Sequence, residues 1–262
     1  GNKSNFLYEV SSFTVKEKSY SLITLGDTAD HKDLRQKIFF FHTDNLFNVI
    51  PSENFKKFSY KTRMQEFPRY SQDTLFLKCR FWIITDISFY DNAKRSSLDQ
   101  SSSSFTVFEK EKISNVKIMS IAACEEFEER SELEIHSLST HVTYRGLGLA
   151  SSLLTVVMNY LRDLASNSTK GKYKRMILYS AHFSHISNGL YRRRGFTLNS
   201  KRNFIQYSVG LEYASKTEYL EARKKAISDN RSPSKDGSEE LLNSILDEVA
   251  FKLVLENYEL DL

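Results

Sequence analysis

A short glycine-containing segment between an apolar run and an amphipathic helix constrains the fold of this chain most. Residues 133–138 form a strand-like run, and residues 145–150 read Arg-Gly-Leu-Gly-Leu-Ala. Directly afterwards, apolar residues recur at helical spacing on one face: Ala150, Leu153, Leu154, Val157, Met158, Leu161 and Leu164. A strand, a glycine turn and a helix N-terminus in this order present backbone N–H groups to a phosphate. The pattern therefore predicts a pyrophosphate-binding loop.

Each part of this loop has a predicted role in binding. The small residues Gly146, Gly148 and Ala150 let a ligand approach the backbone closely. The guanidinium of Arg145 adds a charge-assisted donor at the mouth of the loop. The predicted contacts are Arg145, Gly146, Leu147, Gly148, Leu149 and Ala150.

Composition limits the class of protein. The 262 residues are 40% hydrophobic and 13% aromatic, which suits a folded globular chain with a sizeable core. The two cysteines, Cys79 and Cys124, lie far apart, which argues against a disulfide scaffold or a zinc ribbon and fits a reducing compartment. No apolar run is long enough to cross a bilayer and no signal peptide is evident, so we expect an intracellular protein, cytoplasmic or nuclear, without a membrane partner. Gly1 in place of Met suggests a cleavage scar with native residues missing upstream.

Charge is distributed unevenly. From Glu239 onward there are seven acidic residues against Lys252 alone. The net positive charge of the chain therefore lies entirely before residue 239. A basic body suits an anionic ligand such as a coenzyme, or an acidic partner, and an ordinary solvated surface explains it equally well. The basic residues form no nucleic-acid motif, so nucleic acid is not an expected partner.

The remaining elements follow from periodicity and turn residues. We expect strands at 20–25, within 75–89, and at 116–124, 133–138, 176–179 and 204–209. Helices are expected at 30–47, 53–67, 149–165 and 187–194. The polar stretch 92–104 is predicted to be a loop or a hairpin insertion. The strand–helix–strand crossover from 133 to 180 should be right-handed and place its two strands in parallel.

The region after residue 210 has a different character. Ser215 and Glu218 form a capping box for a charged helix, and residues 229–237 are typical of a linker. A last amphipathic helix is expected over 238–257, packed on the main body or available for a partner or for self-association.

Two motifs together resemble the GNAT superfamily of acyl-CoA-dependent N-acetyltransferases. Its pyrophosphate motif is matched by Arg145, Gly148 and Ala150, and its leucine–tyrosine pair followed by Gly-Phe is matched by Leu190, Tyr191, Gly195 and Phe196. The resemblance implies an α/β (α+β) fold, with a mixed, mostly antiparallel central sheet. Strands four (132–140) and five (175–180) splay apart, and helices flank the sheet. The resemblance places the acetyltransferase domain at 1–210, with core motifs in 75–210. It does not cover the residues after about 210, so the C-terminal helical extension at 211–262 is expected from the sequence pattern alone.

The resemblance also implies the donor and its contacts. Acetyl-CoA is the expected co-substrate, and no metal is expected. Its pantetheine arm would lie along strand four at Leu138, Ser139 and Thr140, where a backbone N–H would stabilise the oxyanion of the thioester carbonyl. Ser184 stands where the family often has a coenzyme-contacting asparagine, and Val142 stands where a proline is usual. His182 and His185 form an H-x-x-H pair without an evident third ligand, so we assign them no metal.

Three residues are catalytic candidates. Glu134, eleven residues before Arg145, matches the catalytic glutamate of histone-type family members. His136 shares a strand face with Glu134 and occupies a second position where other members carry a glutamate. Either could remove a proton from the amine, directly or through water, or be an ordinary ion-paired or hydrogen-bonded strand residue. Tyr191 matches the family's general acid for the departing thiolate, or packs in the core.

The sequence therefore predicts an N-acetyltransferase acting on a primary amine by direct attack on the thioester. A protein or peptide lysine or N-terminus is favoured, because the loop resembles that of N-terminal acetyltransferases and Glu134 resembles the base of lysine acetyltransferases. Two alternatives stay open: a GNAT-like module that binds acyl-CoA or a protein without turnover, and a small-molecule amine acetyltransferase.

Overall fold

The structure, a computed structural model, describes seven ranges of the chain: residues 7–26, 28–49, 76–107, 113–181, 184–203, 216–228 and 254–262. The chain divides into two compact units. The first contains residues 1–45, 76–178 and 260–262, and the second contains residues 46–75 and 179–259. The glycine turn and strand 132–140 belong to the first unit, and Tyr191 belongs to the second.

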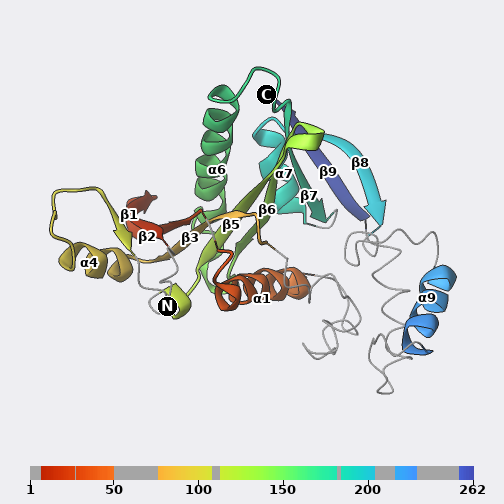
Figure 1. The fold of residues 1–262 in the computed structure, drawn as a ribbon, viewed down its shortest axis with the longest axis horizontal. Coiled ribbons are helices and arrows are strands. Elements are labelled where there is room, and N and C mark those ends of the chain that lie inside the picture. Colours follow the sequence, from red (N-terminus) through yellow and green to blue (C-terminus); the bar gives the residue numbers. More distant parts are fainter. Residues whose placement is uncertain are drawn as a thin grey trace. The chain divides into compact units, whose positions relative to one another are not determined.

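A twisted sheet forms the frame of the first unit (Figure 1). Its strands are β1 (Tyr8–Val15), β2 (Lys18–Leu25), β3 (Arg80–Asp86), β4 (Ser104–Val107), β5 (Ser120–Phe127), β6 (Glu132–Thr140) and β7 (Arg175–Ala181). They lie in the order β4-β1-β2-β3-β5-β6-β7. Every neighbouring pair is antiparallel except β6 and β7, which are parallel. The predicted mixed, mostly antiparallel sheet and the parallel crossover are therefore confirmed.

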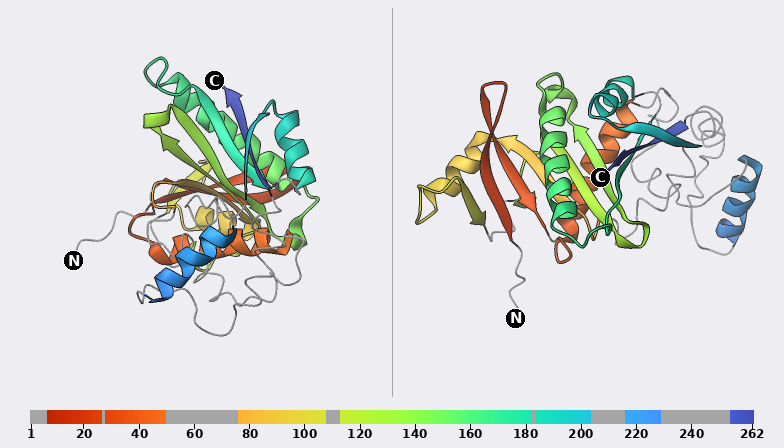
Figure 2. Two further views of the ribbon diagram at one scale, coloured as in Figure 1. Left: turned by 90° about the vertical axis from the view of Figure 1, so that its right-hand side faces the viewer. Right: turned by 90° about the horizontal axis from the view of Figure 1, so that it is seen from above.

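Two long helices cover opposite faces of this sheet, α1 (Lys32–Val49) and α6 (Leu149–Ser166) (Figures 1 and 2). Leu34 and Ile38 of α1 belong to one buried cluster with Phe81 and Ile83 of β3. Between those two positions Trp82 points to the other face, where its ring contacts Tyr160 of α6. In the described ranges, no helix is long and apolar enough to cross a lipid bilayer.

The edge of the first unit differs from expectation. The predicted strand at 20–25 is part of β2, but it pairs with β1, an additional strand with alternating buried and exposed residues. The polar stretch 92–104 begins inside helix α4 (Ile87–Arg95), and its last residue opens β4, which pairs with β1. The predicted helix at 53–67 lies outside the described residues.

A bulge interrupts β6 in its second half. Ala123 of β5 faces His136, but Ile121 faces Ser139, so β6 has one residue more than its partner. Ser137 lies at this bulge and has a φ of 55°, in the left-handed region. The pairing of β6 with β7 ends at Ile135, while β6 continues to Thr140. The half of β6 that precedes the glycine turn thus departs from regular pairing.

The second unit contains helices α7 (His185–Arg193) and α9 (Lys216–Ser228) and strands β8 (Thr197–Asn203) and β9 (Val254–Asp261). Strands β8 and β9 pair antiparallel. The predicted helix over 238–257 is therefore wrong at its C-terminal end, where residues 254–257 are extended. Leu255 to Tyr258 are all buried, and pairing with β8 gives their backbone groups partners that a local pattern cannot reveal. The predicted strand at 204–209, the linker at 229–237 and the rest of that helix lie outside the described residues.

Candidate active site

The glycine turn connects β6 to α6 as predicted. After β6 a single 3₁₀ turn, η3 (Val142–Tyr144), leads to Arg145 in extended conformation. Gly146 and Gly148 have φ of 79° and 83°, a region that side chains disfavour, so both positions require glycine for the backbone path. Gly148 is the N-cap of α6, whose first turn contains no acidic residue. A helix N-terminus without an acidic side chain suits an anion.

Arg145 and the end of β6 are held together by hydrogen bonds. Arg145 Nε donates to the carbonyl of Thr140 over 3.3 Å, which orients an exposed guanidinium beside the turn. Ser120 of β5 donates its hydroxyl to the carbonyl of Ser139 over 3.1 Å and hydrogen-bonds Thr140 Oγ1 over 2.9 Å. Leu138, Ser139 and Thr140 are only partly buried. Hydrogen bonds from β5 thus hold the strand segment that is predicted to bind pantetheine, and this segment is accessible to a ligand.

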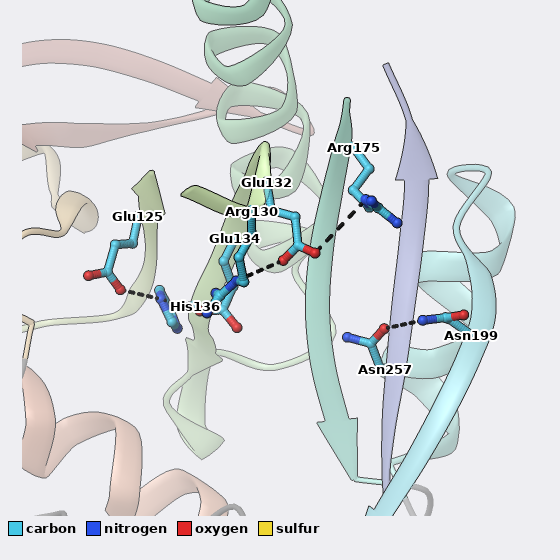
Figure 3. Close-up of polar contacts among 8 residues, drawn as sticks. All are labelled: Glu125, Arg130, Glu132, Glu134, His136, Arg175, Asn199 and Asn257. Atoms are coloured by element: carbon cyan, nitrogen blue, oxygen red, sulfur yellow. Dashed lines mark hydrogen bonds and ion pairs between the residues drawn. The ribbon is translucent and has the colours of Figure 1, made fainter. Parts of the chain in front are cut away.

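The two predicted bases, Glu134 and His136, form an ion pair with each other (Figure 3). His136 Nε2 lies 2.6 Å from a carboxylate oxygen of Glu134 and 3.1 Å from one of Glu125 on β5. Glu125 stands directly opposite Glu134 in the strand register, which explains why three side chains meet. Only 8% of the Glu134 side chain and 16% of the His136 side chain are exposed, so these charges interact in a medium of low polarity.

This environment determines the protonation of His136. Burial alone would lower the pKa of the imidazole, but the carboxylates of Glu134 and Glu125 outweigh it and raise the pKa to about 9. At neutral pH His136 is therefore an imidazolium and cannot accept a further proton. Two carboxylates around one imidazolium leave the group of Glu125, Glu134 and His136, here called the acidic triad, with one net negative charge.

A buried thiol completes the surroundings of the triad. The donor atoms of Cys79, Glu125 and His136 lie within 4.8 Å of one another, and such donors can bind zinc. Burial, together with the charges of Glu125 and Glu134, raises the pKa of the Cys79 thiol far above its usual range. Without a metal ion the thiol is therefore protonated and the imidazole carries its own proton, so Glu125 and His136 form an ion pair beside a neutral thiol. Cys124 is also a free, buried thiol.

A second imidazole lies on the same face of β6. His42 of α1 hydrogen-bonds through Nδ1 to the hydroxyl of Ser139 over 2.6 Å. Burial, and then the positive charge of His136, lower the pKa of His42 to about 4, so this ring is neutral at physiological pH. His42 lies 97 positions before Ser139, and the sequence offered no signal that would place it there.

Tyr191 and Ser184 lie on α7 in the second unit. The Tyr191 ring is 6% exposed and packs against Phe196 and Tyr258, with ring centroids 6.3 and 6.0 Å away. Burial, and then the neighbouring Tyr258, raise the pKa of Tyr191 above its usual value, so its hydroxyl keeps its proton. Ser184 is the N-cap of α7 and makes no side-chain capping bond. His182 lies outside the described residues.

The predicted residues of the first unit therefore form one continuous path, from the triad through Leu138–Thr140 to the turn at 145–150. Glu125, Cys79 and His42 were missed. For Glu125 a signal existed: a short turn near Arg130 would place residues 125 and 134 opposite each other in a hairpin.

The chain matches one protein family and is similar to several solved structures. The model of the acetyltransferase (GNAT) family matches residues 64–196, which is half of the chain. Similar solved structures include a GNAT-family acetyltransferase from Staphylococcus aureus, with 10% identity, coverage of 92% of this chain and 98% of that chain, and a TM-score of 0.41. Another is Arabidopsis thaliana NAA60 in complex with a bisubstrate analogue, with 12% identity, coverage of 92% and 99%, and a TM-score of 0.42.

A third is the microcin C7 self-immunity acetyltransferase MccE in complex with acetyl-CoA and AMP, with 10% identity, coverage of 92% of each chain and a TM-score of 0.42. No curated protein matches the chain by sequence. The match to the family model, and not the similarity to these structures, assigns the chain to a family.

Proposed function

Because this chain belongs to the acetyltransferase (GNAT) family, whose members use acetyl-CoA and need no metal, we propose that it is an N-acetyltransferase acting on a primary amine. The observation that carries the proposal is the continuity of β6 with the glycine turn. Strand β6 bears Glu134, His136 and a backbone bulge, and it leads to a helix N-terminus. These are the groups that an amine, a thioester and a pyrophosphate would each need.

The donor binds along this path. The amides at the start of α6 and the guanidinium of Arg145 bind the pyrophosphate. The edge of β6 at Leu138 and Thr140 hydrogen-bonds the pantetheine amides, and Ser184 contributes a further contact. The bulge supports this arrangement, because it takes a backbone N–H near Leu138 out of the regular ladder and frees it for the thioester carbonyl.

Glu134 is the proposed base. The amine arrives as an ammonium and must lose a proton before its nitrogen attacks the thioester carbonyl. His136 is already protonated, so Glu134 takes the proton, directly or through a water molecule, while His136 holds its carboxylate in place. The net negative charge of the acidic triad also attracts the ammonium.

Collapse of the tetrahedral intermediate breaks the carbon–sulfur bond and releases a thiolate. Tyr191 is the proposed acid that protonates this sulfur. Its buried hydroxyl has a raised pKa and therefore remains protonated until the thiolate forms.

The proposed acceptor is a protein or peptide amine, at a lysine or an N-terminus. The proposal rests on two resemblances, of the loop at 145–150 to N-terminal acetyltransferases and of Glu134 to the base of lysine acetyltransferases. A small-molecule amine and a module without turnover are the competing outcomes.

The test is incubation of the protein with acetyl-CoA and a panel of peptides and polyamines, following the release of free thiol. We expect thiol release with peptides, and its loss in Glu134→Gln. Glu132→Gln is the matched control, because Glu132 lies on the same strand but pairs with Arg130 and Arg175 (Figure 3). Thiol release with polyamines alone would show that the acceptor is a small-molecule amine and not a peptide. Tight CoA binding without thiol release would support a binding module.

A further inference from the structure

The turn between β1 and β2 reaches the glycine turn of the first unit. A Cβ atom placed on Gly148 would lie 3.1 Å from Lys16 Cε, 3.5 Å from Lys16 Nζ and 3.5 Å from a methyl group of Val15. The Lys16 side chain therefore occupies the space that Gly148 leaves open and brings its ammonium to the N-cap of α6. Lys16 is remote in sequence from this loop, and no motif includes it.

This placement brings like charges together. The helix N-terminus carries a partial positive charge, and a cation beside it is normally unfavourable. Arg145 adds a full positive charge to the same turn, and the first turn of α6 contains no acidic residue that would compensate. An anion bound between these groups would remove the repulsion, and a phosphate would hydrogen-bond both side chains.

The hairpin turn also holds Lys16 in an unusual backbone conformation. Val15 pairs with Lys18, so Lys16 and Glu17 form a two-residue turn, with φ of 47° and 68°. Such turns favour Asn-Gly or Asp-Gly, since side chains at positive φ are strained. Lysine at this position is thus unfavourable for the hairpin itself. Its presence agrees with a role of its ammonium outside the hairpin.

We propose that Lys16 is a coenzyme-binding residue whose ammonium contacts a phosphate of coenzyme A at the glycine turn. This inference rests on the proposed function, because it takes acetyl-CoA as the ligand of the loop. The contacted group is one of the pyrophosphate phosphates or the 3′-phosphate of the ribose, and all of them offer the same anionic oxygens to a lysine. Lys16 thereby links the N-terminal hairpin to donor binding.

The test compares CoA binding by the full chain and three variants, measured by calorimetry. Lys16→Asn removes the charge but suits the positive φ, so it should fold at least as stably as the wild type. Glu17→Gly relieves the same turn and keeps Lys16. Lys18→Ala removes a neighbouring lysine whose ammonium lies 5.3 Å from the centre of the Tyr20 ring instead.

We expect Lys16→Asn to weaken CoA binding about tenfold, the effect of losing one charge-assisted hydrogen bond. Glu17→Gly and Lys18→Ala should bind like the wild type, and Lys16→Asn should leave the affinity for pantetheine, which has no phosphate bridge, unchanged. Dephospho-CoA separates the phosphates: if it still binds Lys16→Asn about tenfold more weakly than the wild type, the lysine contacts the pyrophosphate. If it binds both equally, the lysine contacts the 3′-phosphate.

Equal CoA affinity of Lys16→Asn and the wild type would overturn the inference while leaving the proposed function intact. A wild-type chain that binds no CoA at all would overturn both, so the two failures are distinguishable.

Discussion

Replacing Glu134 with glutamine removes the carboxylate nearest to the His136 imidazole and should lower the pKa of that imidazole. In the wild type the pKa is raised from 6.5 to about 9 although burial opposes the rise. A rise of this size corresponds to about 3 kcal/mol in favour of the imidazolium, since each pH unit equals about 1.4 kcal/mol. Glu134 is the closer of the two carboxylates, at 2.6 Å against 3.1 Å for Glu125.

Loss of an opposite charge at this distance typically changes a pKa by about one to three pH units. We therefore expect the pKa of His136 to fall by at least one pH unit in Glu134→Gln, and by less in Glu125→Gln. The assay is an NMR pH titration of the His136 ring protons. Glu132→Gln, which removes a carboxylate that pairs with arginines on the same strand, should leave the titration unchanged.

The same pKa has a consequence for stability. Because the folded-state pKa lies above the unfolded one, the ion pair stabilises the fold fully below pH 6.5, and this contribution is lost as the pH rises through about 9. In urea titrations the wild type should lose more stability between these pH values than Glu134→Gln does. A His136 that titrates near 6.5 in the wild type would refute the account of the acidic triad, and with it the argument that selects Glu134 as the base.

Three further predictions concern other parts of the molecule. Gly148→Ala should weaken CoA binding about tenfold or more in calorimetry, because φ is 83° there and the new methyl group would displace Lys16; unchanged affinity would contradict the assigned turn. Tyr191→Phe should lower kcat while leaving KM for acetyl-CoA nearly unchanged, since Tyr191 acts on the leaving thiolate; a wild-type kcat would mean that Tyr191 only packs in the core. Cys79 and Cys124 should react with a disulfide reagent only after unfolding, because both thiols are buried with raised pKa values; rapid reaction in the native protein would show that the sheet is open at this position.

The accuracy of the sequence-based predictions depended on how local each feature is. The turn at 145–150 and helix α6 follow from glycine positions and a 3.6-residue period within thirty residues, and both were predicted to within a residue or two. The ion pair of Glu134 with His136 is also local, because alternate residues of a strand share a face.

Several features that depend on long-range pairing were not predicted. Glu125 joins His136 only through the β5–β6 register, and His42 only through the packing of α1. The first residues of strand β9 were predicted to be the end of a helix, because the apolar residues there fit the helical period as well as the strand period. Only the pairing with β8 favours the extended form. Lys16 lies beside Gly148 through hairpin geometry that no sequence period encodes.

The central claim is that the acetyl group passes directly from CoA to an amine on this chain. The most direct measurement counts, in one reaction mixture, the thiol released from acetyl-CoA and the acetyl groups found on a peptide by mass spectrometry. The account predicts one acetylated amine for each thiol, with both lost in Glu134→Gln and kept in Glu132→Gln. Thiol release without acetylated peptide, or equal turnover by the two variants, would contradict it.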